Sequence, residues 1–344
     1  MFIKKEKYGK INGKSSVFCF TLKNNHGIEV KILNYGGIIT SIKTLNKKGH
    51  IENIALGCDT LQQYIDDTSY FGAIIGRYGN RIANGTFCLD DTQYSLVKNN
   101  GINHLHGGNI GFHKVLWNAT TISSKNSVSL ALDYESKDME EGFPGNLKTS
   151  VTYTLTSNNS LDIRYEATSD KKTIVNLTNH TYFNLSGNFN NTILDHEIQI
   201  NANGMLPVNN YMIPTGEIKS VENTPYDFRE LKTIAKDIYT KDKQLEFGLG
   251  YDHCWVLENQ NQGVRLVAKA FHKDSGRLIE VFSDEPGIQF YSGNHLNGKH
   301  QFRTGFCLET QHYPDSPNHK NFPSVELKPN EIYTSNTSYK FSTY

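Results

Sequence analysis

The sequence predicts an all-β protein, a large antiparallel β-sandwich with few short helices. Short runs of β-branched and aromatic residues recur along the chain, and turn-forming residues, including 28 glycines among 344 residues, separate them. A helical period of apolar residues is hard to find. Large all-β domains often exceed about 200 residues as one unit. We therefore expect residues 1–344 to form a single domain, with a division into two sandwiches as the alternative.

Local turn signals predict three hairpins and two helices. Residues 60–70 and 231–239 are the only segments that are plausible as short helices. Each hairpin joins two strand-like runs through a short turn of Asp, Asn, Ser, Pro or Gly. The paired segments are 86–89 with 93–97, 151–155 with 161–165, and 278–282 with 288–292.

The charge balance argues against two classes of partner. Lys and Arg together number 35, as do Asp and Glu, so the formal net charge is zero. Proteins that bind nucleic acid or a membrane surface need a basic face, and no segment approaches the roughly 20 apolar residues of a membrane span. We expect no nucleic-acid partner, no membrane and a small or uncharged ligand.

The cysteines and the start of the chain predict a cytoplasmic protein. The five cysteines are scattered and form no CxxC pair, which is typical of reduced thiols in a reducing compartment. The basic start of the chain is not followed by the apolar stretch that a signal peptide requires.

The segment VNLTNHTYFNLSG, residues 175–187, has one apolar and one polar face if it is a strand. A solvent-facing edge strand is the alternative interpretation. Solvent faces usually carry long charged side chains, however, and this one has none. The sequence therefore favours the floor of a polar cleft. The polar face consists of Asn176, Thr178, His180, Tyr182 and Asn184.

A single carboxylate, Glu309, lies between apolar neighbours in FCLETQHY, residues 306–313. Alternation places it on the face opposite to Phe306 and Leu308. Such a carboxylate is either a paired buried charge or a functional acid or base, and the sequence alone favours neither. Gln289 adds a polar group to another strand-like segment.

Further candidate residues lie in glycine-flanked segments. His104 and His106 could ligate a metal from one strand face, but no third ligand follows at a suitable spacing, so no metal site is predicted. The segment GRYGNRIANG, residues 76–85, carries Asn80 and Arg81 but lacks the strand–glycine–helix pattern of a phosphate-binding loop.

These segments supply imidazole, carboxylate, amide and guanidinium groups without a nucleophile elbow or a nucleotide loop. Asp252, just ahead of an apolar strand, adds a second carboxylate or is a turn residue. A histidine and a carboxylate without a cofactor indicate general acid–base chemistry on a polar small molecule.

From about Asn34 to the C-terminus, the sequence resembles the galactose mutarotases (aldose 1-epimerases). The segments that carry the resemblance, in family order, are NYGGIITSI, ALGCDTLQQYI, GRYGNRIANGTF, NHLHGGNIGFHKVLW, VNLTNHTYFNLSG, PTGEI, GYDHCWVL, DEPGIQFYSGNHLNG and GFCLETQHYPDSPNH. The resemblance implies a large antiparallel β-sandwich with an open sugar cleft. It also implies an isomerase of hexose metabolism that interconverts the anomers of free D-galactose and D-glucose without a cofactor.

The resemblance further implies roles for individual residues. The family's base is Glu309 here and its acid is His180, a carboxylate and an imidazolium on opposite sides of the anomeric carbon. His106 is expected to hydrogen-bond near the ring oxygen. The residues implied to hold the sugar hydroxyls are Asn80, Arg81, Tyr182, Asp252 and Gln289.

The sequence departs from the family pattern at four positions outside these residues, namely Gly79, Thr181, His295 and Asn297. These departures leave the shape of the cleft rim and the preferred sugar undetermined, but they do not affect the expected chemistry. The sequence does not decide between galactose and glucose, between monomer and homodimer, or which pathway supplies the sugar.

Three alternatives stay open. A relative acting on hexose 6-phosphates would need extra cations at the cleft, and Arg77 could join Arg81 there if the segment between them is extended. A non-catalytic carbohydrate-binding sandwich would bind sugar without turnover. A metal-dependent sandwich enzyme using His104 and His106 ranks last.

Overall fold

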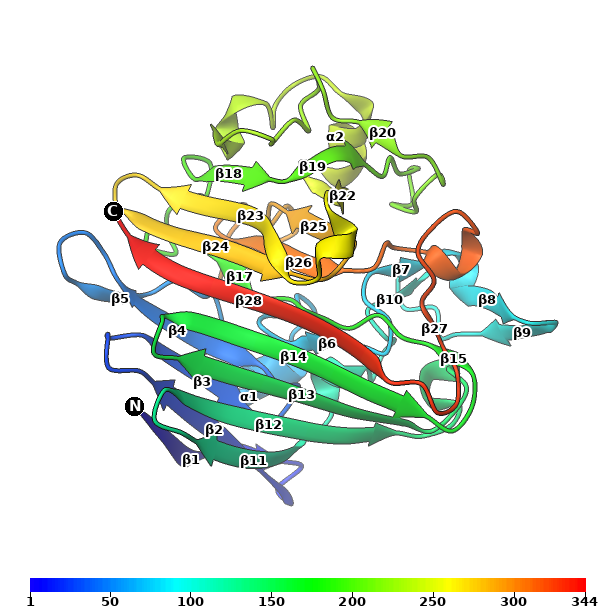
Figure 1. The fold of residues 1–344 in the computed structure, drawn as a ribbon, viewed down its shortest axis with the longest axis horizontal. Helices are drawn as coiled ribbons and strands as arrows, with labels where there is room; N and C mark the ends of the chain where they lie inside the picture. The colour runs from blue at the N-terminus through cyan, green and yellow to red at the C-terminus, as the bar shows by residue number, and fades with distance from the viewer.

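Three large antiparallel sheets dominate the computed structural model, which describes residues 1–344 (Figure 1). The first is a five-stranded meander in which each strand pairs with the next along the chain. Its lysine-rich first strand lies at an edge, where charged side chains discourage further pairing. Its strands in order are β1 (Phe2–Ile11), β2 (Ser15–Lys23), β3 (Glu29–Leu33), β4 (Ile39–Leu45) and β5 (Ile51–Asn53).

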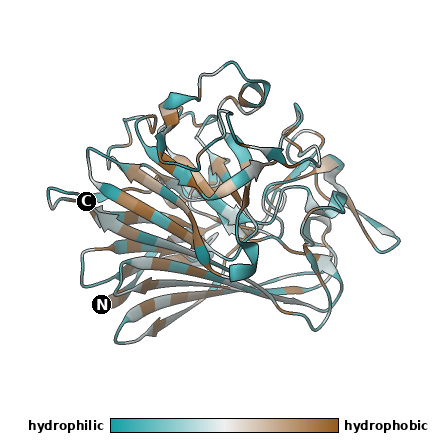
Figure 2. Cartoon of the chain, turned by 45° about the horizontal axis from the view of Figure 1, so that its top comes forward, coloured by the Kyte–Doolittle hydropathy of each residue, from teal (hydrophilic) through white to brown (hydrophobic).

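The second sheet has nine strands and includes the C-terminal strand, which lies between two distant parts of the chain (Figure 1). Apolar and polar residues alternate along its strands, as expected of a sheet with one face on a core (Figure 2). Its order is β11 (Asn118–Ser123), β12 (Ser127–Ser136), β13 (Leu147–Thr156), β14 (Ser160–Ser169), β28 (Tyr333–Thr343), β24 (Arg277–Ser283), β23 (Arg265–His272), β18 (Glu197–Ile200) and β21 (Lys232–Thr233).

The third sheet, of six strands, carries most of the polar segments that the sequence singles out. Its order is β17 (Tyr182–Phe183), β26 (Phe306–Gln311), β25 (Gly287–Tyr291), β22 (Asp252–Leu257), β19 (Ala202–Met205) and β20 (Lys219–Ser220). Four two-stranded ladders complete the fold: β6 (Ile74–Ile75) with β16 (Thr178–Asn179), β7 (Arg81–Ile82) with β10 (His104–Leu105), β8 (Thr86–Leu89) with β9 (Thr92–Ser95), and β15 (Thr173–Ile174) with β27 (Glu326–Leu327).

Helices are few and short. The two α-helices are α1 (Leu61–Asp66) and α2 (Lys243–Gly248). Neither approaches the length or the apolar character that a crossing of the membrane would demand. Single 3₁₀ turns are η1 (Ala83–Gly85), η2 (Phe112–Lys114), η3 (Glu140–Gly142), η4 (Ile234–Lys236), η5 (Gln260–Gln262) and η6 (Ser316–Asn318).

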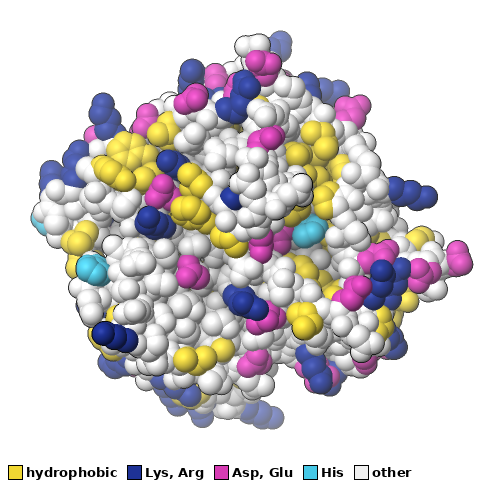
Figure 3. All heavy atoms as spheres, in the orientation of Figure 1, with side chains coloured by type: hydrophobic (Ala, Val, Ile, Leu, Met, Phe, Trp, Pro, Cys, Tyr) yellow, Lys and Arg dark blue, Asp and Glu magenta, His cyan; other side chains and the backbone are white.

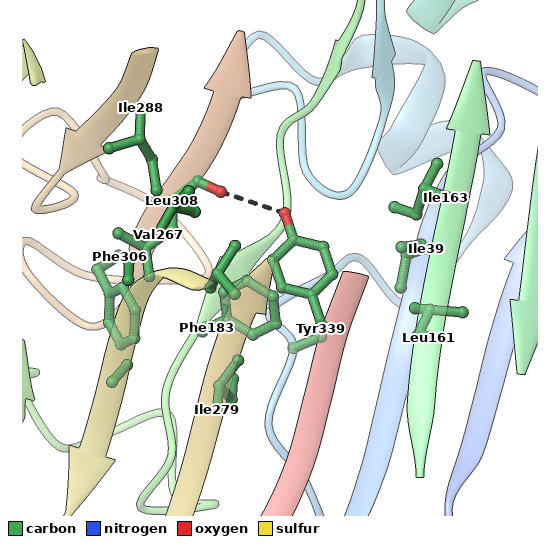
Figure 4. Close-up of a cluster of buried hydrophobic side chains, with 14 of the residues drawn as sticks. Ile39, Leu161, Ile163, Phe183, Val267, Ile279, Ile288, Phe306, Leu308 and Tyr339 are labelled. Atoms are coloured by element: carbon green, nitrogen blue, oxygen red, sulfur yellow. Dashed lines mark hydrogen bonds between the residues drawn. The ribbon is translucent and has the colours of Figure 1, made fainter. Parts of the chain in front are cut away.

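One apolar core of 54 buried residues connects the three large sheets. In Figure 4, Leu161 of β14 lies close to Ile39 of β4, and Phe306 of β26 in the six-stranded sheet lies beside Phe183. The buried Tyr339 of β28 donates its hydroxyl hydrogen to the carbonyl of Leu308 at 3.1 Å, which ties the nine-stranded sheet to the six-stranded sheet. The predicted fold class is confirmed.

Two of the three predicted hairpins are confirmed: β8–β9 and β13–β14. The third is wrong, because β24 belongs to the nine-stranded sheet and β25 to the six-stranded sheet. The connection crosses between sheets, and the buried Arg265 guanidinium donates to the carbonyls of Ser283 and Glu285 at 3.0 and 3.1 Å. Turn residues predict a reversal but not the sheet in which the next strand pairs.

The first predicted helix is confirmed in a shorter form, α1, which begins at a capping box formed by Thr60 and Gln63. The second, over 231–239, is wrong. The strand β21 in this segment pairs with Glu197 and Ile198 of β18, so tertiary pairing overrides the local helical pattern. Only one 3₁₀ turn, η4, follows it. The helix α2 lies a few residues later and begins at Asp242, whose carboxylate accepts two backbone N–H groups.

Candidate active site

A cavity of about 330 Å³ opens on the six-stranded sheet and brings together seven of the eight sequence-predicted site residues. These are Asn80, Arg81, His106, His180, Tyr182, Asp252 and Glu309. The eighth, Gln289, is buried and is absent from the lining. Segments that are far apart in the chain therefore converge on one site.

Strand register explains why the carboxylates gather on one face. Asp252 pairs with Tyr291, and Gln289 pairs with Glu309. Side chains of directly paired residues share a face of the sheet. The alternate residues Phe306 and Leu308 point into the core on the other face, as the alternation in the sequence predicts.

The segment 175–187 is broken into short pieces rather than forming one strand. Its apolar side still packs in the core, through Val175, Leu177, Phe183 and Leu185. Its polar side is buried, so the solvent-facing interpretation is wrong. Most of these polar side chains donate hydrogen bonds to backbone carbonyls. For example, Thr178 donates to the carbonyl of Thr310 at 2.9 Å.

His180 and Glu309 lie next to each other in the cavity lining, with 3.8 Å between Nε2 and Oε1. They are 5% and 2% exposed, and Oε2 of Glu309 has no hydrogen-bond partner. The other imidazole nitrogen, Nδ1, lies 3.5 Å from the Cys307 sulfur. An imidazole and a carboxyl group so placed can exchange protons with a ligand that binds against both of them in the cavity.

Burial shifts the pKa values of this pair away from their ordinary order. Burial lowers the pKa of His180 to about 4, with Asp252 opposing the shift. Burial and the nearby Asp252 carboxylate raise the pKa of Glu309 well above its ordinary value, and Arg81 opposes that shift. Both groups are thus held toward their neutral forms.

His106 is fixed by the backbone of Asn80. The Asn80 N–H donates to Nδ1 of His106 at 3.1 Å, and the His106 N–H donates to the Asn80 carbonyl at 3.1 Å. Because Nδ1 accepts, the ring proton lies on Nε2. The His106 ring lies 5.3 Å from that of His180, and burial with these neighbours lowers the pKa of His106 well below its ordinary value.

His104 does not join His106 at a common site. Its Nδ1 lies 2.7 Å from the carbonyl of Val97, and its ring packs on Phe143. The two histidines therefore face different neighbours.

Arg81 reaches the cavity, whereas Arg77 does not. The Arg81 side chain is oriented by Asn100, whose Oδ1 accepts from Nε at 3.1 Å. The Arg77 guanidinium is buried against the Ser136 and Pro144 carbonyls instead. Asn80, with a φ of 63°, breaks the extended conformation that would have put both arginines on one face.

Gln289 lies behind Asp252 and donates to its Oδ1 at 2.7 Å. Tyr182 lines the cavity with its ring, while its hydroxyl donates to the carbonyl of Ser69 at 3.0 Å. Gln289 therefore orients a lining carboxylate.

Sequence reasoning missed several lining residues. The Tyr70 ring lies 4.7 Å from that of His106 and 5.9 Å from that of His180. Asn100 lies in a glycine- and asparagine-rich turn that carried no catalytic signal. Only Tyr291 could have been found, because it shares a strand face with Gln289. The family departures His295 and Asn297 lie at the exposed rim.

Known proteins resemble this chain over nearly its whole length. The family model described as aldose 1-epimerase matches residues 19–340. The galactose mutarotase of Bos taurus is 42% identical over 339 residues, covering 96% of this chain and 95% of its own length. The aldose 1-epimerase of Escherichia coli (strain K12) is 38% identical, covering 93% of this chain and 94% of its own length.

Among solved structures, a galactose 1-epimerase from Lactobacillus acidophilus superposes with a TM-score of 0.89 at 29% identity, covering 99% of each chain. The family model and these relatives extend over nearly the whole chain, and they confirm the resemblance in sequence and fold. The protein belongs to the aldose 1-epimerase family.

Proposed function

We propose that this aldose 1-epimerase interconverts the α and β anomers of free hexoses, D-galactose and D-glucose, with Glu309 as base and His180 as acid. The observation that carries the proposal is the His180–Glu309 pair, 3.8 Å apart in a cavity whose lining also supplies amide, guanidinium and carboxylate groups. Such groups match the hydroxyls of a sugar, and the pair matches the two proton transfers of the reaction.

Ring opening needs one proton removed and one delivered. Glu309 takes the proton of the anomeric hydroxyl while His180 gives a proton to the ring oxygen, and the bond between the anomeric carbon and that oxygen breaks. The open-chain aldehyde turns about the bond beside its carbonyl. Closure on the other face reverses both transfers, so the residues return to their starting states and no electrons are lost or gained.

The pair works with a single shared proton. Burial disfavours charge on both groups, so the proton rests on Glu309 and the imidazole is neutral before a sugar binds. Ring opening uses the other arrangement, with the proton on His180. Arg81 stabilises the Glu309 carboxylate of that arrangement. Asp252 stabilises the imidazolium of His180 but disfavours the Glu309 carboxylate.

The remaining residues position the sugar. Asn80, Arg81 and Asp252 bind hydroxyls, and His106 donates from Nε2 near the ring oxygen because its Nδ1 is already bonded. Gln289 acts through Asp252. Holding the substrate in this way supplies orientation, which lowers the barrier without a covalent step.

Polarimetry on freshly dissolved α-D-galactose and α-D-glucose tests the proposal. The enzyme is expected to speed the approach to the equilibrium rotation for both sugars. Sugar binding without any acceleration would instead support a non-catalytic carbohydrate-binding protein and would contradict the proposal.

Hexose 6-phosphates are expected to be poorer substrates. A phosphate dianion needs more than one cationic donor to offset its desolvation, and Arg81 is the only Lys or Arg in the lining. We expect the initial rate with galactose to exceed that with galactose 6-phosphate at equal low concentration by about tenfold or more. A faster phosphate ester would contradict the free-sugar assignment.

We also infer that the protein acts in the cytoplasm as a monomer or homodimer, without nucleic-acid or membrane partners. All five cysteines are free, and on the face in Figure 3 cationic and anionic side chains are interspersed rather than segregated. Sedimentation of the purified protein distinguishes monomer from homodimer.

A further inference from the structure

We propose that His180, Cys307 and Glu309 also form an inhibitory site for a thiophilic divalent cation, with Zn²⁺ as its probe. This inference rests on the proposed function only for its inhibitory consequence, because the cation would occupy the proposed acid and base. Binding itself depends on three side chains that lie beside the sugar cavity.

The three ligand atoms are close enough to share one ion. One nitrogen of His180, the sulfur of Cys307 and a carboxylate oxygen of Glu309 all lie within 4.8 Å of one another. Nitrogen, thiolate and carboxylate are the donors that Zn²⁺ takes, at about 2.0 to 2.3 Å. A tetrahedral ion would therefore need these side chains to close by roughly 1 Å.

Burial raises the pKa values of the Cys307 thiol and the Glu309 carboxyl group, so a cation binds by displacing their protons. Cys307 is fully buried, and Oε2 of Glu309 is buried without a hydrogen-bond partner. His180 and Glu309 line the cavity, which gives the ion a path of entry and leaves its fourth position to water. On binding, the Cys307 thiol and the Glu309 carboxyl group each release a proton to solvent, and the metal–sulfur and metal–oxygen bonds form.

A second cluster has similar residue types but lacks free ligand atoms. His196 receives the Leu185 N–H on Nε2 at 2.9 Å, and its Nδ1 lies 2.9 Å from Asp195. His272 receives the Ser275 N–H on Nδ1 at 3.2 Å, and its Nε2 lies 3.2 Å from Asp195. A cation there would have to displace existing hydrogen bonds, so this cluster is no candidate site.

Inhibition by Zn²⁺ should be reversible and competitive. An ion held by His180 and Glu309 excludes the anomeric centre of a sugar, so the apparent KM rises while kcat at saturating sugar is unchanged. Removing the ion with a chelator should restore the full rate, because the ion takes no part in turnover.

The kinetic test compares Cys307→Ala with Cys254→Ala. Cys254 is a matched control because it is a buried thiol of the same sheet, and its sulfur lies 3.8 Å from the Trp255 carbonyl rather than beside an imidazole. Each variant's inhibition by free Zn²⁺ is measured against its own metal-free rate. We expect Cys307→Ala to raise the inhibition constant at least tenfold and Cys254→Ala to leave it unchanged. Equal inhibition of both variants and wild type, or none in wild type, would overturn the proposal.

A spectroscopic test does not depend on turnover. Co²⁺ added to the wild-type protein should give the ultraviolet charge-transfer absorption of a cobalt–thiolate bond. The band should persist in Cys254→Ala, vanish in Cys307→Ala and fall when galactose is added. If the band formed but no sugar were epimerised, the metal site would stand while the proposed function failed. Absence of the band, or its persistence in Cys307→Ala, refutes the site.

Discussion

At the candidate active site, burial moves the pKa values of His180 and Glu309 in opposite directions. The ordinary carboxyl is the stronger acid by about two units, yet here the pKa of His180 falls to about 4 and that of Glu309 rises well above its usual value. These shifts favour a free enzyme in which Glu309 holds the proton and His180 is neutral, so that proton must move to His180 before ring opening.

Removing either member of the pair should nearly abolish turnover. We expect Glu309→Gln and His180→Asn each to lower kcat by at least about 10²-fold, because each variant loses one of two concerted proton transfers. The double variant should be little worse than the poorer single variant, since the two groups act as a unit. Polarimetry with α-D-galactose measures the rates, and near-normal turnover in either single variant would refute the role assigned to it.

The pH dependence of kcat/KM should show a broad plateau. The active pair holds one proton, so activity falls when a second proton binds near pH 4, the lowered pKa of His180. It falls again only when the last proton leaves, above the ordinary range of a carboxyl group, because the pKa of Glu309 is raised. Initial rates, corrected for spontaneous mutarotation and with folding checked by circular dichroism, test this. An acid limb near pH 6.5 would show an unperturbed histidine instead.

At the scale of elements, the paired strands β25 and β26 position several residues of the candidate site. Their register sets Gln289 beside Glu309 on the cavity face, while Phe306 and Leu308 anchor β26 in the core. The entry into β25 crosses from one sheet to another, and Arg265 covers the carbonyls exposed by that crossing.

Arg265→Met should therefore destabilise the fold. The substitution removes the donors to the Ser283 and Glu285 carbonyls, and leaving such groups buried without a partner costs about 2 kcal/mol or more of unfolding free energy. The matched control is Arg164→Met, because exposed Arg164 is paired only with Glu166, a contact worth less than about 1 kcal/mol. Urea denaturation measures the unfolding free energy of both variants. Equal stability of the two variants would show that the crossover does not depend on Arg265.

At the scale of the whole molecule, one core links all three large sheets, and the last strand, β28, lies inside the nine-stranded sheet between β14 and β24. We propose that residues 1–344 fold as a single domain, because no large sheet can lose its partner without exposing this core. Urea unfolding followed by tryptophan fluorescence and by far-ultraviolet circular dichroism should give coincident transitions. Two separated transitions would favour two sandwiches.

Buried histidines should make the protein sensitive to acid. Burial lowers the pKa of His113 to about 3 and the pKa values of His104 and His253 to about 4. Below about pH 6.5 the unfolded chain binds protons that the folded chain excludes, so stability falls as the pH drops from there toward 4. Each such histidine lowers the unfolding free energy by up to about 1.4 kcal/mol for each unit by which the pH falls in this range. Urea midpoints between pH 7 and pH 5 check this, and constant midpoints would contradict it.

The sequence by itself determined the strand-rich fold class, two hairpins and seven of the residues that line the cavity. Alternation in residues 306–313 is a local property, so the pattern alone correctly separates Glu309 from Phe306 and Leu308. The family motifs supplied His180 and Arg81 in the same way, because each motif is a contiguous run of residues.

Only the tertiary structure decided what depends on partners distant in the chain. It placed β24 and β25 in different sheets and turned Arg77 away from the cavity. It also brought Tyr70 against His106, a contact that no spacing predicts. The physical reason is that alternation and turn chemistry fix which face a side chain takes. Strand pairing and loop packing, which join residues far apart in sequence, fix what that face meets.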